Sequence, residues 1–280
     1  MKIGVHVLPR FPKDTTDRNR TSPFAFTGNK FEFRMLGSAA SIAMANTILN
    51  AAVAEVLSQF ADKLENVNDF EGALHDLIKS EITSHKRILF NGNGYDDSWV
   101  VEAEKRGLSN YKTLPDAVKH YLDPKNVELL TKHNVYSEVE MNSRHEIFLE
   151  KYCKLLNIEY QTMSVMAKQD ILPAVSAYSA ELASDIAAIE SAGGSADFEK
   201  ETFAEISADM NAANKSLKAL NKLIGELDAI DDYEVLADKI KDEMIPAMDA
   251  LRANCDKLEL ETAAEYWPFP TYGELLFGVR

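Results

Sequence analysis

The sequence lacks any long uninterrupted apolar run. Of its 280 residues, 46% are hydrophobic and 27% are charged, and no stretch approaches the ~18 consecutive apolar residues that mark a transmembrane helix. The first residues, MKIGVHVLPR, include basic side chains but neither a continuous apolar segment nor a small-residue cleavage site, so they do not resemble a secretory signal peptide. We therefore expect a cytoplasmic protein that does not use a membrane as a partner.

Cysteine and histidine are scarce as well. Cys153 and Cys255 are the two cysteines, and they stand about 100 positions apart. They provide neither the density of a disulfide framework nor metal-ligand spacing, which predicts buried free thiols in a reducing compartment. The six histidines are scattered and form no HxH or HxxxH pair, so the sequence predicts no histidine-based metal site.

Positive charge is in deficit over the whole chain. There are 30 Lys and Arg against 45 Asp and Glu, a net charge of -15. So acidic a chain repels nucleic acid, which we exclude as a partner. The first 34 residues differ, because seven basic and three acidic side chains give them +4 and leave -19 for the other 246 residues. This cationic segment predicts an anionic ligand.

Periodicity predicts a mostly α fold with a short N-terminal β segment, residues 1–36 being strand and loop. Residues 37 to about 90 predict two helices, and the first is so rich in apolar residues that we expect it to be buried on more than one side. Short helices and then a bundle of long helices follow, and we expect Pro173 and Pro246 to kink or break the long ones. The long helical segments span roughly 137–192, 196–229 and 232–263, with breaks at Gly193-Gly194 and Asp231-Asp232.

Polar residues mark the expected helix ends. Asn68-Asp69 predicts the start of the second helix, which ends near Leu89, and Asp96-Asp97-Ser98 predicts the start of a short helix that Gly107 closes.

The residues that suggest chemistry lie in the cationic segment. Alternate side chains of a strand share one face, so Lys30, Glu32 and Arg34 would line one side and Phe31 and Phe33 the other. A carboxylate suits a hard divalent cation, and the flanking cations suit phosphoryl or carboxylate oxygens. An exposed strand with a cross-strand ion pair would produce the same pattern, so spacing alone leaves both interpretations open.

The segment DRNRTSPFAFTGNKFEFRMLGS resembles the C-terminal part of the glutamine synthetase catalytic domain, in particular its type III form. The likeness rests on the pair Asn19-Arg20 and on the strand Lys30 to Arg34. It continues through the alanine-rich helix and the blocks FNGNGY, MNSRHEIFLEKY, AKQDILPA and WPFPTYGELLF, and so covers nearly the whole chain. It implies a remnant of the α+β catalytic domain over residues 1–90 and a type III-specific helical domain over residues 91–280.

The resemblance also implies roles for individual residues. Glu32 would ligate one of the active-site divalent ions, Mg²⁺ or Mn²⁺. Arg34 and Arg20 would be the catalytic arginines: Arg34 would hold glutamate and the transferring phosphoryl group, and Arg20 would contact glutamate and the phosphates of ATP. Lys30 stands where the family has arginine, so it keeps a charge near the nucleotide but loses the fork geometry. Ala25 replaces a further arginine of many relatives, which leaves one phosphate contact unassigned.

The reaction implied by the resemblance joins ammonia to glutamate at the expense of ATP, in a large homo-oligomer of like subunits. The remaining metal ligands, the ammonia site and most of the nucleotide pocket of the family lie upstream of the matched region, and we find no substitutes. We therefore expect the chain alone to be inactive. Two alternatives stay open: residues 91–280 form a non-catalytic assembly module, or a separate N-terminal chain complements this one.

Overall fold

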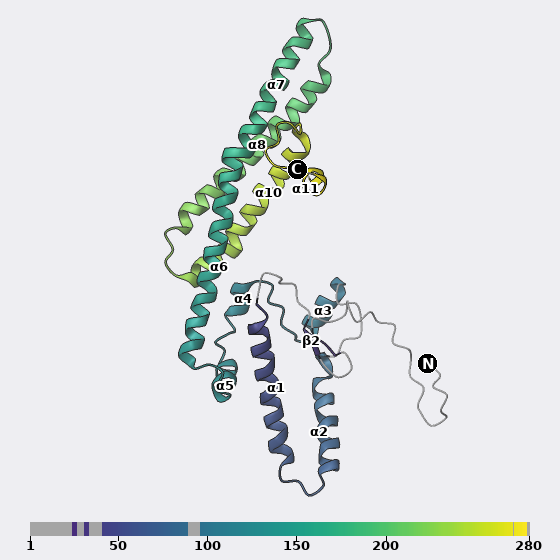
Figure 1. Cartoon of the computed structure of the whole chain (residues 1–280), viewed down its shortest axis with the longest axis vertical. Coiled ribbons are helices and arrows are strands. Elements are labelled where there is room, and N and C mark those ends of the chain that lie inside the picture. The colour runs from purple at the N-terminus through teal and green to yellow at the C-terminus, as the bar shows by residue number, and fades with distance from the viewer. Residues whose placement is uncertain (1–23, 27–30, 34–40, 89–95, 271, 279–280) are drawn as a thin grey trace, which may run out of the picture. The chain divides into compact units, whose positions relative to one another are not determined.

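The computed structural model describes residues 24–26, 31–33, 41–88, 96–270 and 272–278 (Figure 1). The chain divides into two compact units: Met1–Lys112 with Pro124–Ser137, and Thr113–Asp123 with Glu138–Arg280. Helices dominate the described residues of both units, which confirms the mostly α fold class. The predicted domain boundary near residue 90 is a different kind of division and stays a prediction.

The first unit contains one antiparallel strand pair within its described residues. Strand β1 (Phe24–Phe26) pairs with β2 (Phe31–Phe33), and the register places Ala25 opposite Glu32. The other residues of the predicted β segment, at positions 1–23, 27–30 and 34–36, lie outside the described residues.

Two helices follow in this unit, α1 (Ala43–Leu64) and α2 (Phe70–His85). The Asp69 carboxylate accepts a hydrogen bond of 3.1 Å from the backbone N–H of Gly72, so the predicted cap of the second helix is confirmed. The 3₁₀ helix η1 (Lys86–Ile88) continues α2 to the predicted end near residue 89. Helix α5 (Pro124–Lys132) packs against α1.

The expectation that α1 is buried on more than one side is wrong for the described structure. Ala51 is its one buried residue. Val53 and Leu57 are 52% and 59% exposed. The apolar surface of α1 exceeds what α2 and α5, its neighbours among the described helices, can cover. A helix that is apolar on several faces therefore keeps exposed apolar side chains in the described part of the chain.

Helix α3 (Asp97–Lys105) shows that local sequence signals set helix ends correctly. The Asp96 carboxylate accepts from the backbone N–H of Ser98 at 2.8 Å and caps the start. At the other end Gly107 has a φ of +73°, a left-handed conformation that costs glycine little. The N–H of Leu108 then reaches the carbonyl of Ala103 at 2.9 Å, so the helix closes with a Schellman motif.

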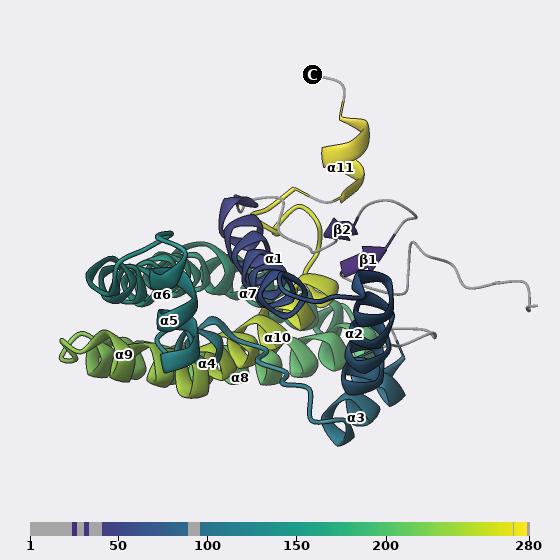
Figure 2. The same ribbon diagram turned by 90° about the horizontal axis from the view of Figure 1, so that it is seen from below.

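The second unit is a bundle of long helices. Helix α8 packs against both α7 and α10, and in Figures 1 and 2 it runs back along α7 before the chain returns along α10. The turn between α7 and α8 contains Gly193, with a φ of +82°, as the predicted break at Gly193-Gly194 requires. The elements of this unit are α4 (Leu114–Val118), α6 (Glu138–Met166), η2 (Ala167–Ile171), α7 (Leu172–Ser191), α8 (Asp197–Leu227), α9 (Tyr233–Lys239), η3 (Ile240–Met244), α10 (Ile245–Glu261) and α11 (Tyr272–Phe277).

The expected disruption at Pro173 and Pro246 takes the form of a π-helical turn before each proline, η2 and η3. In each turn a backbone N–H bonds five residues back, from Leu172 to Ala167 and from Ile245 to Ile240. A proline inside a helix supplies no N–H, and its ring clashes with the carbonyl four residues before it. A π turn inserts one extra residue into the helix and thereby shifts that carbonyl. The helical path therefore continues through both prolines.

The core of the second unit is made mainly of aliphatic side chains, together with Tyr160 and two thiols. Cys153 and Cys255 are both buried and free, as predicted. Burial raises the pKa of the Cys153 thiol to about 11, so it stays protonated and unreactive near neutral pH. Among the helices that the structure describes, none is both long and apolar enough to cross a membrane. Fully buried core side chains include Ile206, Leu220, Ile240, Met244, Leu251 and Leu258.

Candidate functional site

The structure describes the backbone at one of the four predicted site residues. Glu32 is the central residue of β2, opposite Ala25, the position where many relatives of the resembled family carry arginine. Arg20, Lys30 and Arg34 lie outside the described residues. Their roles in binding glutamate and ATP, and the role of Glu32 as a metal ligand, therefore stay predictions.

A metal site is not assembled within the part of the chain that the structure describes. No group of three or more His, Cys, Asp or Glu side chains there could hold an ion. Divalent cations of the Mg²⁺ class take about six oxygen ligands, several of which can be water or phosphate. Glu32, the predicted metal ligand, would supply one of these oxygen ligands.

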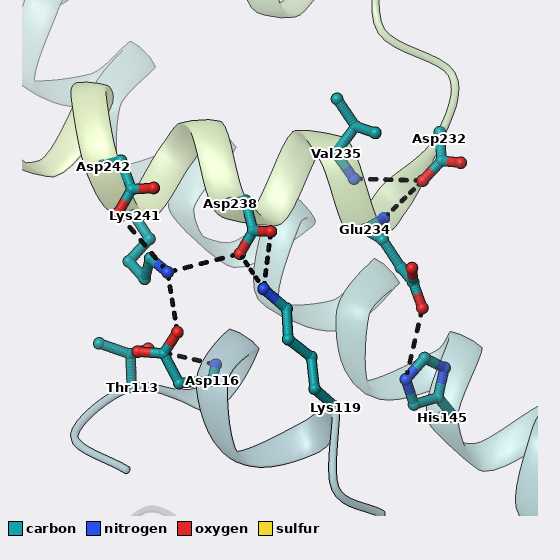
Figure 3. A network of polar contacts seen from close by, with 10 residues as sticks. All are labelled: Thr113, Asp116, Lys119, His145, Asp232, Glu234, Val235, Asp238, Lys241 and Asp242. Carbon is teal, nitrogen blue, oxygen red and sulfur yellow. Dashed lines mark hydrogen bonds and ion pairs between the residues drawn. The ribbon is translucent and has the colours of Figure 1, made fainter. Parts of the chain in front are cut away.

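The described residues do form a conspicuous polar cluster in the second unit, drawn in Figure 3, which we call the Lys241 network. The Lys241 ammonium lies 2.8 Å from Asp116 and 3.4 Å from Asp238. The Lys119 ammonium donates to both oxygens of Asp238, at 2.8 and 2.9 Å. The carboxylate of Asp242 lies 3.5 Å from Lys241. These pairs join α4 and the residue that follows it to α9 and η3.

Electrostatics make this network a structural cross-link. The hydrogen bond from Lys241 lowers the pKa of Asp116, and that from Lys119 lowers the pKa of Asp238. The hydrogen bond to Asp116, helped by the charges of Asp242 and Asp238, raises the pKa of Lys241. All three groups are consequently charged at neutral pH, and none is poised to exchange a proton as a general acid or base.

Figure 3 also shows two neighbouring contacts, and the first of them lies at a predicted helix boundary. The Asp232 carboxylate accepts from the backbone N–H groups of Glu234 and Val235 at 2.8 and 3.1 Å and caps α9. The sequence predicts a helix break at this position. His145 is buried, and its ring lies 3.7 Å from Glu234. That spacing is a loose ion pair and does not indicate a metal ligand.

Replacing Lys241 with methionine should lower the melting temperature at pH 7. It should also make the melting temperature fall less steeply as the pH is lowered. Lys241 depresses the pKa of Asp116 in the folded chain, so the stabilising effect of this pair is present above the ordinary value of 3.8 and is lost as pH falls through the lower folded pKa. Lys119 remains in the variant and continues to depress the pKa of Asp238. Thermal melts followed by circular dichroism from pH 7 down to about 2.5 measure both effects.

Lys222→Met is the matched control, because the Lys222 side chain is 81% exposed and its pair with Glu226 spans 3.5 Å. Exposed pairs of this kind contribute little to stability. A control that is as destabilised as Lys241→Met would contradict the cross-link.

Comparison with known proteins adds independent information. The model of the family described as Glutamine synthetase C-terminal domain matches residues 73–190. A Glutamine synthetase of Bacteroides fragilis (strain YCH46) is 34% identical over 99% of this chain. A Type-3 glutamine synthetase of Dictyostelium discoideum is also 34% identical over 99%, and a Glutamine synthetase of Butyrivibrio fibrisolvens is 35% identical over 96%. The chain spans 39% of the length of each of these relatives.

Proposed function

The chain belongs to the glutamine synthetase family, and from this premise we propose that it is the C-terminal part of a type III glutamine synthetase. The observation that carries the proposal is the even likeness to three relatives: 34–35% identity over 96–99% of the chain. One of these relatives is named as type 3. The other 61% of their length has no counterpart here.

The proposed activity of the complete enzyme is the ATP-dependent joining of glutamate and ammonia to give glutamine, ADP and phosphate. This chain would supply Glu32 to a divalent ion, Arg34 and Arg20 to glutamate and the phosphoryl group, and Lys30 to the nucleotide. The position of Glu32 within strand β2 (Phe31–Phe33) supports this assignment. Fixed cations suit phosphoryl transfer, since negative charge gathers on the phosphoryl oxygens.

ATP and Mg²⁺ or Mn²⁺ belong to the proposed complete enzyme. The ion would offset charge on the transferring phosphoryl group, with Glu32 as the one ligand proposed from this chain. The further ligands and most of the nucleotide pocket would come from the 61% of the relatives' length that has no counterpart here. We also place the enzyme in the cytoplasm, as the two free thiols support.

An activity assay on two proteins tests the proposal. The purified chain, supplied with ATP, Mg²⁺, glutamate and ammonia, should form no glutamine above background. A chimera that fuses the unmatched part of the Bacteroides fragilis relative to this chain should form glutamine. Robust turnover by the chain alone, or an inactive but well-folded chimera, would contradict the proposal.

A second candidate is an assembly module without chemistry. The observation that favours it is the exposed apolar surface of α6, where Leu155 and Ile158 are 49% and 64% exposed. Exposed apolar patches of this kind mark protein contacts. Light scattering on the purified chain tests this candidate, because a strictly monomeric chain at high concentration would argue against an assembly role.

A further inference from the structure

The second unit contains an apolar groove that the proposed synthetase function does not use. It has a volume of about 560 Å³ and lies among α6, η2, α10 and the segment that follows α10. Small-molecule sites have volumes of ~300–1,000 Å³ and mostly apolar linings. The side chains that make the floor and walls include Met163, Ile171, Met248, Leu251, Trp267 and Phe269.

The rim of the groove carries an excess of negative charge. Glu159, Arg252, Asp256 and Glu259 are its four charged lining residues. Arg252 donates to the Asp256 carboxylate at 2.6 Å, so those two charges balance. Neither Glu159 nor Glu259 forms a hydrogen bond or ion pair among the described residues, although the charge of Glu259, like that of Asp256, raises the pKa of Arg252. Three carboxylates and one guanidinium leave the rim with a net charge of -2 beside an apolar interior.

Aromatic rings complete the wall. Trp267 and Phe269 both line the groove, with ring centroids 6.2 Å apart and planes at 75°. Because the two ring faces point in different directions, one can contact a flat apolar body while the other contacts a cation attached to it. The negative face of an indole ring attracts an ammonium group, and this attraction grows when the ammonium leaves water.

We propose that this groove binds a small organic cation with an aromatic or branched apolar body, such as an arylalkylammonium. The apolar body would fill the interior between Met163, Leu251 and Trp267. The ammonium would remain at the rim, close to Glu159 and Glu259. A carboxylate ligand of the same shape would meet two like charges there, and a neutral ligand would gain only the apolar contact.

The π turn η2 gives the groove its form on one side. Ala167 and Ile171, the first and last residues of η2, both line it. A π turn widens the helix by one residue, and such turns occur frequently at functional sites. The disruption that Pro173 requires in the helix is thus placed beside the cavity.

Fluorescence of Trp267 provides a direct test in the full chain. The protein has two tryptophans, so the Trp99→Phe variant leaves Trp267 as the sole reporter. We would titrate it with 2-phenylethylammonium, 2-phenylethanol and 3-phenylpropanoate at constant ionic strength. Saturable changes are expected, with the ammonium binding about tenfold tighter than the alcohol and the carboxylate binding weakest.

Two double variants separate the rim from the net charge of the chain. Glu159→Gln with Glu259→Gln should bring the ammonium-to-alcohol ratio close to one while leaving the affinity for the alcohol unchanged. Glu146→Gln with Glu243→Gln removes the same charge from exposed positions outside the groove and should keep the ratio.

The proposal is overturned by any of three results. These are no saturable signal with any ligand, equal affinity for the ammonium and the alcohol in the unmodified groove, and loss of the preference in the control variant. Because the readout is binding in the helical unit, none of these results bears on the proposed synthetase activity.

Discussion

Replacing Glu32 with alanine in the full-length chimera is expected to lower metal-dependent glutamine formation by at least about a hundredfold. A metal ion at a transferring phosphoryl group contributes several kcal/mol of stabilisation, and each ~1.4 kcal/mol is a factor of ten in rate. Loss of one carboxylate ligand would also weaken the binding of the metal ion by the ligands that remain. The measurement is the initial rate of glutamine formation over a range of Mg²⁺ concentrations, with the half-saturating concentration expected to rise.

Glu65→Ala is the matched control for Glu32→Ala. Glu65 is an exposed glutamate at the C-cap of α1, where its backbone N–H bonds to Ala61 and its side chain has no described partner. We expect its rate and its Mg²⁺ dependence to match those of the unmodified chimera. Comparable losses in both variants would show that the site has been placed on the wrong residues.

Local features of the structure were predictable from the sequence. Asp69 and Asp96 cap α2 and α3, and Gly107 and Gly193 end helices with left-handed backbone angles. Each of these signals acts within about four residues, so a single chain carries all the information that they need. The disruption of the long helices at the two prolines was also predictable, although the sequence did not reveal that it would take the form of a π turn.

Non-local features were not predictable in the same way. The Lys241 network joins Lys241 to Asp116, which is 125 positions away, and no periodicity encodes such a pairing. The burial of α1 was predicted wrongly because apolar composition shows only that a helix has apolar surface. It does not show which other element packs against that surface. At the candidate site, residue spacing alone did not decide whether Glu32 is a metal ligand or an exposed strand residue. The specific role came from the family resemblance.

Replacing Leu258 with alanine should destabilise the second unit by roughly 2–5 kcal/mol. Leu258 has no exposed surface and belongs to the core that unites α8 and α10. The substitution removes its apolar contacts and leaves a cavity that close-packed neighbours refill only in part. Urea unfolding followed by Trp267 fluorescence, in the Trp99→Phe background, reports on this unit because Trp267 packs against the same core.

Leu260→Ala is the matched control for Leu258→Ala, because the substitution is the same and lies two residues further along α10. Leu260 is 88% exposed. Its truncation removes almost no buried surface, so we expect a change within about 0.5 kcal/mol. The two positions share helix, residue type and helix propensity, which cancel in the difference. That difference therefore isolates burial, and equal destabilisation at both positions would mean that the α8–α10 core is packed differently from the structure described.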